Sequence, residues 1–314
     1  MADGSGYPFA ELGSTRAEGI EQLEISTRSL CRAAGTEVGA TVYRSEEAES
    51  REFMKEISAT LESRRIRSSQ NEAASSDVQD CVPVQEAYDR WAPTYDQFPN
   101  PLLNLEEREL GAFIPRLKGK RVLDLACGTG RWLEKLSSQG TDVGVGVDFS
   151  VAMLRVAETK PAVRGRLARA DCEHLPFQAS TFDFVVCSFA LGHIRDLRGL
   201  ARELGRVART GADILTSDLH PEAYEKGWRT GFRDARGAVE IDTWARSAEE
   251  IAGCFYSQGF ECLSHMSLWL GEPEKPIFDR AGKSNLFLAA SQVPAILVSH
   301  FQLAAFDRVS RSEQ

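Results

Sequence analysis

Three aspartates, Asp124, Asp148 and Asp171, stand where side chains could act together on a ligand. Asp124 and Asp148 each close a short apolar segment that has the composition of a buried strand, and Asp171 follows a third strand predicted at about residues 165–170. Because the carboxyl ends of parallel strands meet at one edge of a sheet, we expect the three carboxylates to surround a common crevice. Carboxylates can accept hydrogen bonds from hydroxyl and amine groups and can attract a positive charge. The sequence therefore predicts a ligand site at this edge.

A glycine-rich turn follows the first of these segments. Residues 122–125 form an apolar run without polar alternation, which is typical of a buried parallel strand. Gly128 and Gly130 come next and allow a sharp turn and a close approach of a ligand to the backbone. Apolar residues then recur at helical spacing, at Trp132, Leu133 and Leu136. A strand, a glycine turn and a helix in this order open a mononucleotide-binding unit.

Two positions indicate which class of ligand suits this turn. A dinucleotide site needs a third glycine three residues after the second, for close packing of helix on strand, and that position is Leu133. Pyrophosphate also disfavours nearby negative charge, whereas Asp124 lies inside the mouth of the turn. A carboxylate there suits a ligand that carries an ammonium group and no phosphate. S-adenosylmethionine is such a ligand, and we expect it as the cofactor.

The stretch Asp124-Leu-Ala-Cys-Gly-Thr-Gly130 resembles the first motif of class I S-adenosylmethionine-dependent methyltransferases. The variant is similar to that of the small-molecule group that includes the ubiquinone- and menaquinone-biosynthesis enzymes. Ala126 departs from the family, in which many members carry glycine at this position. The resemblance implies an α/β fold with a seven-stranded, mostly parallel, doubly wound sheet in the order 3-2-1-4-5-7-6 and helices on both faces. It also implies an enzyme that moves a methyl group to an O, N or C atom of a small molecule.

A second resemblance to the same family lies upstream. Residues 88–96 are similar to the family's Tyr-Asp-x-x-Ala-x-x-Tyr-Asp segment, which folds over the cofactor and helps to close the acceptor pocket. The resemblance implies that Tyr88 and Tyr95 bind substrate. Aromatic rings over a sulfonium exclude water and offer π-faces to the cation. The alternative is that Tyr88, Trp91 and Tyr95 form ordinary core at helical spacing.

The second predicted strand supplies further cofactor contacts. Asp148 ends an apolar segment about 20 residues after the glycine turn, where an acid can accept hydrogen bonds from both ribose hydroxyls. By resemblance, Phe149 and Met153 flank the adenine. The alternative for Met153 is a core side chain that fills space.

The third strand leads into residues 171–177, which resemble the family's Asp-Ala-x-x-Leu-Pro-Phe segment. By this resemblance, Asp171 accepts from the adenine amino group and the N–H of Cys172 serves a ring nitrogen. The complete predicted cofactor set is Asp124, Ala126, Cys127, Gly128, Thr129, Gly130, Asp148, Phe149, Met153, Asp171, Cys172 and Ser188.

Two histidines are candidates for removing a proton from the acceptor. His193 lies in residues 182–194, which form the fourth strand and its exit, and His220 follows the fifth strand at 212–218. Both strand exits border the crevice in which methyl donor and acceptor should meet. The alternatives are that His193 satisfies backbone groups at a helix start, and that the reaction needs alignment alone. The histidines show no metal-ligand spacing, so no metal is expected.

Residues 221–245 interrupt the alternation of strands and helices, and we expect an insertion on the acceptor side. Trp228 is predicted to bind substrate there. Interleaved arginines could hold a carboxylate or phosphate of the acceptor, and these are Arg229, Arg233 and Arg236. Acidic residues neutralise the segment, so a solvated face is the alternative. Residues 261–270 and 295–303 are then predicted to be a closing antiparallel pair of strands.

Residues 1–80 differ in character from the predicted methyltransferase domain at 81–314. Phe53, Ile57 and Leu61 fall four residues apart, which predicts an amphipathic helix. This helix could mediate homodimerisation or bind a partner, or it could pack on its own domain. We therefore predict a partly helical N-terminal extension of unassigned function.

The composition disfavours several classes of protein. The chain has 314 residues and a net charge of −9, which argues against a nucleic-acid substrate because phosphate binding needs a basic face. Seven cysteines at irregular spacing are typical of free thiols in a reducing compartment. The sequence shows no apolar run long enough to span a bilayer and no signal peptide. The expected location is the cytoplasm.

Two other functions remain open at this level. A non-catalytic module could retain the fold and bind S-adenosylmethionine without transferring its methyl group, because fold does not determine function. A nicotinamide-dependent oxidoreductase would share the acid that binds ribose, but Leu133 and Asp124 argue against it.

Overall fold

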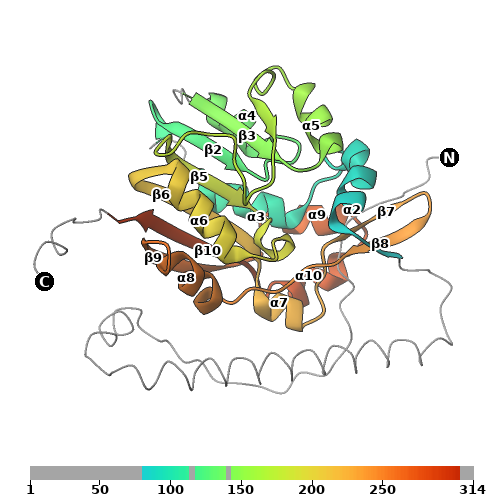
Figure 1. Ribbon diagram of the computed structural model, residues 1–314. Coiled ribbons are helices and arrows are strands. Elements are labelled where there is room, and N and C mark those ends of the chain that lie inside the picture. The colour runs from blue at the N-terminus through green and yellow to red at the C-terminus, as the bar shows by residue number, and fades with distance from the viewer. Residues whose placement is uncertain (1–79, 113–116, 139–142, 305–314) are drawn as a thin grey trace, which may run out of the picture. The chain divides into compact units, whose positions relative to one another are not determined.

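The computed structural model describes residues 80–112, 117–138 and 143–304 (Figure 1). The predicted helix with Phe53, Ile57 and Leu61 lies outside these residues, and so does the rest of the chain before residue 80. The homodimer that this extension could form therefore stays a prediction.

The described residues build a sheet of seven strands in the order β4-β3-β2-β5-β6-β10-β9 (Figure 1). These strands are β2 (Arg121–Leu125), β3 (Val143–Asp148), β4 (Leu167–Arg169), β5 (Phe182–Ser188), β6 (Ala208–Leu219), β9 (Phe260–Trp269) and β10 (Pro294–Leu303). Counted in chain order within this sheet, the arrangement is 3-2-1-4-5-7-6, as predicted. β10 is antiparallel to both β6 and β9, which confirms the predicted closing pair.

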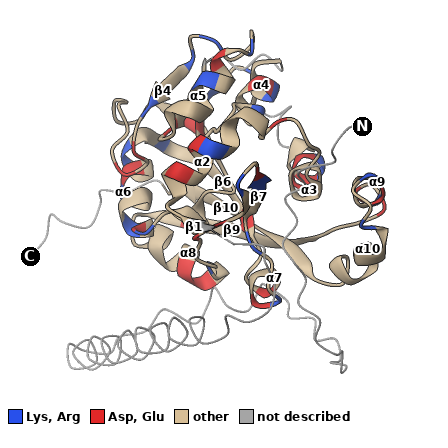
Figure 2. Cartoon of the chain, turned by 90° about the vertical axis from the view of Figure 1, so that its right-hand side faces the viewer, with Lys and Arg blue, Asp and Glu red and all other residues tan. Residues whose placement is uncertain are grey.

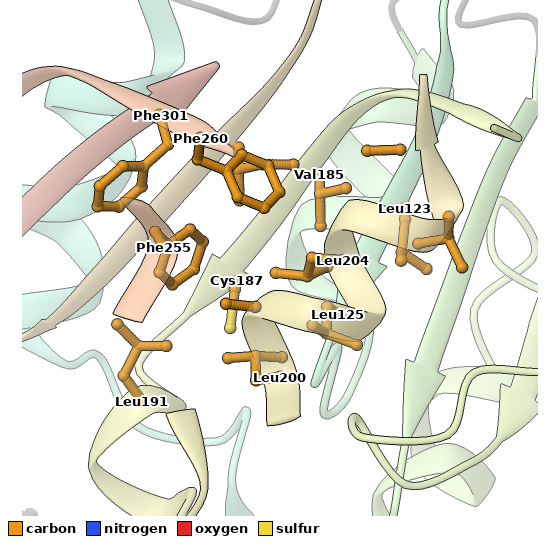
Figure 3. Close-up of a cluster of buried hydrophobic side chains, with 14 of the residues drawn as sticks. Leu123, Leu125, Val185, Cys187, Leu191, Leu200, Leu204, Phe255, Phe260 and Phe301 are labelled. Atoms are coloured by element: carbon orange, nitrogen blue, oxygen red, sulfur yellow. The ribbon is translucent and has the colours of Figure 1, made fainter. Parts of the chain in front are cut away.

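Neighbouring residues of the central strands face opposite sides of the sheet. The flanking helices are α3 (Pro101–Leu110), α4 (Arg131–Ser138), α5 (Val151–Glu158), α6 (Leu197–Val207) and α8 (Ala248–Tyr256). Leu123 and Val185 belong to the core that α6 and α8 cover, where Phe255 and Phe301 stack with ring centroids 4.3 Å apart (Figure 3). Val122 packs in a second core with residues of α3 and α4. The predicted doubly wound arrangement is confirmed.

The fifth strand of the sheet is longer than the sequence indicated. We expected this strand at residues 212–218, but β6 begins at Ala208. Phe182 pairs with Ala208 and Phe184 pairs with Asp213, so the intervening residues form an irregularity in the ladder. A β-bulge absorbs extra residues without ending the strand, which explains the difference.

The predicted insertion at 221–245 folds into a helix and a hairpin. These are α7 (Pro221–Glu225), β7 (Gly231–Asp234) and β8 (Gly237–Ile241). β8 pairs in parallel with β1 (Asp80–Val82), giving a small sheet in the order β1-β8-β7. The small sheet packs on α2 (Val84–Trp91), where Trp91 stacks on Phe232 with centroids 5.1 Å apart. The hairpin and α2 lie side by side in Figure 1.

Two short helices, α9 (Lys275–Arg280) and α10 (Ser284–Ala290), connect β9 to β10. The sequence analysis did not predict them, because each is too short to show a clear helical period. Phe278 and Phe287 anchor them in the second core. Glu274, which is fully buried before α9, accepts from the side chains of Asn104 at 3.0 Å and Arg108 at 3.3 Å. These contacts bind the connection to α3.

Candidate functional site

A cavity of about 460 Å³ lies at the carboxyl ends of β2, β3 and β5. All of the predicted cofactor residues except Gly130 line it, and so do Tyr88, Tyr95 and His193. The helix α2 contributes part of its wall and packs against α5, below which it lies in Figure 2. The structure therefore brings residues from widely separated segments to the edge where the sequence predicted a site. We call this space the main cavity.

Asp124 is the penultimate residue of β2, and its side chain is buried at the wall of the main cavity. Its Oδ2 accepts a hydrogen bond of 2.9 Å from the N–H of Leu133, in the first turn of α4. Burial raises the pKa of Asp124 to about 7, and the Leu133 bond and Arg131 only partly oppose this shift. A cation in the cavity would favour the ionised carboxylate.

The glycine turn serves the site through its backbone. Gly128 has a φ of 53°, and a Cβ built there would meet nothing within 4 Å, so the turn leaves space on its cavity side. Gly130 has a φ of 79°, and a Cβ there would approach Val163 Cγ1 to 3.1 Å. Gly130 is thus needed for the turn and for packing beside α5 rather than for lining the cavity.

Asp148 ends β3 and receives backbone donors from two loops. Its Oδ2 accepts from the N–H of Gly128 at 2.8 Å, and its Oδ1 accepts from the N–H of Ser150 at 2.8 Å. Burial raises the pKa of Asp148, and these backbone bonds oppose the shift. The carboxylate is therefore held at the wall in one orientation.

The residues predicted to surround a purine also line the main cavity. Met153 is 1% exposed and lines the cavity, so it packs in the core at the wall of the site, and its contact with the adenine stays a prediction. Phe149 is 48% exposed, with the Arg169 guanidinium 5.2 Å from its ring centroid. Asp171 is exposed, and its Oδ1 accepts from the N–H of Glu173 at 3.0 Å.

The segment that follows β1, residues 84–96, covers the main cavity. It comprises α2 and the 3₁₀ turn η2 (Ala92–Thr94). Polar contacts fasten it to the sheet side: Ser150 Oγ donates to Asp89 at 2.8 Å, and Thr129 Oγ1 donates to Asp96 at 2.8 Å. We call residues 84–96 the lid.

The aromatic residues of the lid divide into two groups. Tyr88 and Tyr95 line the main cavity, as predicted for substrate-binding residues. Trp91 is 8% exposed and packs in the small core with Phe232, as the alternative interpretation expected.

Tyr88 and His193 meet inside the main cavity. The Tyr88 hydroxyl lies 2.8 Å from His193 Nε2, and the rings are in edge-to-face contact with centroids 5.3 Å apart. Burial lowers the pKa of His193 to about 4, although the backbone of Asp242 opposes the shift, and burial raises the pKa of Tyr88 well above its ordinary value. A neutral imidazole has one nitrogen with a free lone pair, so Nε2 can accept the Tyr88 proton.

Asp218, which the sequence analysis did not select, holds the loop that carries His193. Its Oδ2 accepts from the N–H of Gly192 at 2.6 Å, and its Oδ1 accepts from the N–H of Leu219 at 2.7 Å. Burial raises the pKa of Asp218 to about 6. A signal was present, because Asp218 is another acid near the end of a strand in the sheet.

A buried charged network under the cavity was also missed. Glu106 of α3 is fully buried and accepts from Arg131, from Trp132 Nε1 at 3.2 Å and from Ser188 Oγ at 2.7 Å. Ser188 therefore lines the cavity while its hydroxyl is used within the protein. The only sequence signal was the charged Arg131 directly after the glycine turn.

The structure does not bring His220 into the site, contrary to our expectation. His220 is the N-cap of α7, where its Nδ1 accepts from the N–H of Glu222 at 3.2 Å. Its Nε2 lies 3.1 Å from Ser267 Oγ. Because both ring nitrogens have partners there and the residue does not line the main cavity, His220 is no longer a candidate base.

Trp228 lines a second, smaller cavity of about 90 Å³ instead of the main one.

Within the described residues, no group of three or more His, Cys, Asp or Glu side chains could hold a metal ion. None of the helices in residues 80–112, 117–138 and 143–304 is long and apolar enough to cross a bilayer.

Comparisons with known proteins agree with this geometry. A family model for a methyltransferase domain matches residues 122–211. The demethylmenaquinone methyltransferase of Lactiplantibacillus plantarum is 35% identical over 144 residues, which are 42% of this chain and 60% of that protein. The one of Staphylococcus saprophyticus is 37% identical over 177 residues, which are 54% of this chain and 72% of that protein. The chain thus spans less than two thirds of the Lactiplantibacillus relative.

Solved structures resemble the fold at lower identity. A crystal structure of an S-adenosylmethionine-dependent methyltransferase from Mesorhizobium loti matches with a TM-score of 0.51 and 19% identity. The match covers 65% of this chain and 100% of that chain. At this identity the similarity supports the fold alone.

Proposed function

The chain belongs to the class I S-adenosylmethionine-dependent methyltransferases, and we propose that it transfers the methyl group of that cofactor to an O, N or C atom of a small molecule. The observation that carries the proposal is the composition of the main cavity. Its lining includes the strand-end acids Asp124, Asp148 and Asp171, which we call the cofactor end, and Tyr88 with His193, which we call the acceptor end. Those two ends match a cationic nucleoside donor and a site for proton removal.

The residues at the first end fit the cofactor. Asp124 is a buried carboxylate with a raised pKa, and a ligand ammonium beside it would relieve the cost of its charge. Asp148 would accept from the ribose hydroxyls. Asp171 and the Cys172 N–H would read the adenine edge between Phe149 and Met153, all of which line the main cavity.

The chain's own contribution to the reaction is alignment, exclusion of water and removal of a proton. When bound, the sulfonium supplies a methyl group that is already attached to a good leaving group. Tyr88 and Tyr95 would exclude water from it and offer their ring faces to its charge. Tyr88 would take the acceptor proton on its oxygen while its own proton moves to His193 Nε2, 2.8 Å away.

We also infer an acceptor and a location for the protein. Relatives named demethylmenaquinone methyltransferase make a demethylmenaquinone the first acceptor to test. Free thiols at Cys127, Cys172, Cys187 and Cys254 support a cytoplasmic location.

Calorimetry tests the proposal directly. We expect binding of S-adenosylmethionine and S-adenosylhomocysteine and no binding of NAD. Tight NAD binding without heat from either adenosyl ligand would favour the oxidoreductase alternative. Mass spectrometry after incubation with a methyl-labelled donor and the acceptor separates an enzyme from a non-catalytic binding module, since only the enzyme yields labelled product.

A further inference from the structure

The second cavity of about 90 Å³ adjoins the main cavity. Tyr88, Tyr95, Leu103 and Phe189 line both spaces. A cavity of this size holds several water molecules or one ring-sized group, since about 10–15 Å³ suffices for one water. A molecule held beside Tyr88 and His193 could therefore extend into it past this shared wall.

The wall of the second cavity is mostly apolar. It includes Leu102, Leu219, Leu270, Phe278, Leu286 and Ala290. Apart from Phe189, every lining residue lies outside residues 122–211, the part that matches the methyltransferase domain model. Segments that are not part of the shared cofactor domain are the ones that can differ from one acceptor to another. The position thus suits recognition of this protein's own acceptor.

Arg229, the cationic residue at this wall, already has partners within the protein. Arg229 Nη1 donates to the carbonyl oxygens of Tyr224 and Trp228 at 2.7 Å each. The guanidinium also lies 3.9 Å from the Tyr224 ring centroid and 3.7 Å from a Glu240 carboxylate oxygen. These partners weaken the expectation that Arg229 holds an anionic group. An uncharged occupant fits the wall better.

Trp228 provides a polar group without a partner. Its side chain is buried, with the residue 7% exposed, and its indole Nε1 makes no hydrogen bond within the described part of the chain. A buried N–H without a partner costs about 1–3 kcal/mol, so such groups are rare in folded proteins. Because Trp228 lines the second cavity, an acceptor atom of a ligand in that space is the partner we infer for the indole N–H.

We propose that the second cavity is a subsite for the apolar part of the methyl acceptor, and that Trp228 Nε1–H donates to an oxygen or nitrogen of that part. The inference rests on the proposed function and adds the class of acceptor. This class is an uncharged, ring-bearing molecule with a hydrogen-bond acceptor remote from the atom that is methylated. Its nucleophile lies in the main cavity beside Tyr88 and His193.

Two small probes of nearly the same shape test the subsite. Acetophenone has a carbonyl oxygen where α-methylstyrene has a methylene group. In a ¹⁵N-labelled full chain the five tryptophans give separate indole signals, and that of Trp228 is assigned by its absence in Trp228→Phe. We expect acetophenone to shift the Trp228 signal downfield and to bind roughly three- to tenfold more weakly to Trp228→Phe. α-Methylstyrene should bind both proteins equally and cause no downfield shift.

Further variants control the experiment. Ala290→Leu should fill the subsite and abolish binding of both probes, whereas Trp269→Phe, a change on a half-exposed strand residue, should alter neither. If Trp228→Phe does not fold, the Trp228 signal is assigned from nuclear Overhauser contacts in the wild type, and that signal and Ala290→Leu decide. An unmoved Trp228 signal, or probe binding that survives Ala290→Leu, overturns the subsite. S-adenosylhomocysteine is titrated in parallel, and its failure to bind the wild type would count against the proposed function instead.

Discussion

The two ends of the main cavity are built in different ways. At the cofactor end, Asp124, Asp148 and Asp171 come from one stretch of chain, and backbone N–H groups hold each carboxylate. At the acceptor end, Tyr88 comes from the lid, His193 from the exit of β5, and the adjoining subsite from the insertion and from α9 and α10. Local backbone geometry determines the first end, and long-range side-chain packing determines the second.

The two ends also differ in electrostatics. Burial raises the pKa of Asp124 to about 7 and also raises that of Asp148, so the cofactor end is prepared for a ligand that brings positive charge and donors. Burial lowers the pKa of His193 to about 4, so its imidazole is neutral at physiological pH and its Nε2 can accept a hydrogen bond from the Tyr88 hydroxyl. Changes at one end should therefore affect binding, and changes at the other should affect rate.

The largest effect is expected at the acceptor end. Tyr88→Phe and His193→Gln should each lower the rate of methyl transfer by roughly 10²–10⁴-fold if proton removal limits it, because each interrupts the proposed relay. The dissociation constant of S-adenosylmethionine, measured by calorimetry, should change little. Since the pKa of His193 is about 4, the rate should show no histidine titration between pH 5.5 and 8.

His220→Gln is the matched control for this change. The structure places His220 at the start of α7 with its own partners, so its replacement should leave the rate within about twofold. Losses under about tenfold in both Tyr88→Phe and His193→Gln would instead favour alignment as the whole mechanism.

The next effect belongs to the cofactor end. Asp148→Ala removes the acceptor of two backbone bonds and of the proposed ribose bonds, and should weaken S-adenosylmethionine binding by about 1–3 kcal/mol. The rate at saturating cofactor should change much less than in the His193 variant. A dissociation constant equal to that of the wild type would place the ribose elsewhere.

A smaller effect is expected from pH. Below about pH 7 the raised pKa keeps much of Asp124 protonated and neutral, so it cannot attract the cofactor ammonium. Binding then favours the ionised form and releases a proton. Affinity for S-adenosylmethionine should rise roughly five- to tenfold between pH 6 and 7.5.

Asp124→Asn provides the comparison for this pH dependence. The amide keeps an oxygen for the Leu133 N–H but does not titrate, so the variant should bind weakly and with little change over the same range. Calorimetry in buffers of different ionisation enthalpy measures the released proton directly. If the wild-type affinity for S-adenosylmethionine does not change between pH 6 and 7.5, Asp124 does not bind the cofactor ammonium.

The smallest effect concerns the contact that joins the lid to the glycine turn. Thr129→Val removes the bond to Asp96, whose side chain is 40% exposed, so solvent limits its strength. We expect the dissociation rate of S-adenosylhomocysteine to rise roughly two- to fivefold in stopped-flow measurements. Thr159→Val, which removes only a local bond to the Val156 carbonyl, should leave that rate unchanged.

The same contrast explains what could be predicted from the sequence. The strand order and the cofactor end follow from short motifs, because an acid directly after an apolar strand reaches the same edge in every parallel strand. The pairing of Tyr88 with His193 joins residues 105 positions apart, and no local pattern specifies such a contact.

The misplaced and missed features have the same physical origin. His220 has the right residue type after a strand, but its ring turns to cap α7 and to meet Ser267, which lies 47 positions away. Glu106 is one of several acids in α3, and only its burial against Arg131 and Ser188 distinguishes it. Such roles depend on tertiary packing rather than on spacing.

A crystal structure of the full chain with S-adenosylhomocysteine tests the central claim most directly. The account predicts the adenine beside Asp171 and Met153, the ribose hydroxyls on Asp148, and the sulfur facing the Tyr88–His193 pair. A ligand bound in the reverse direction, or with its sulfur turned away from that pair, would contradict it.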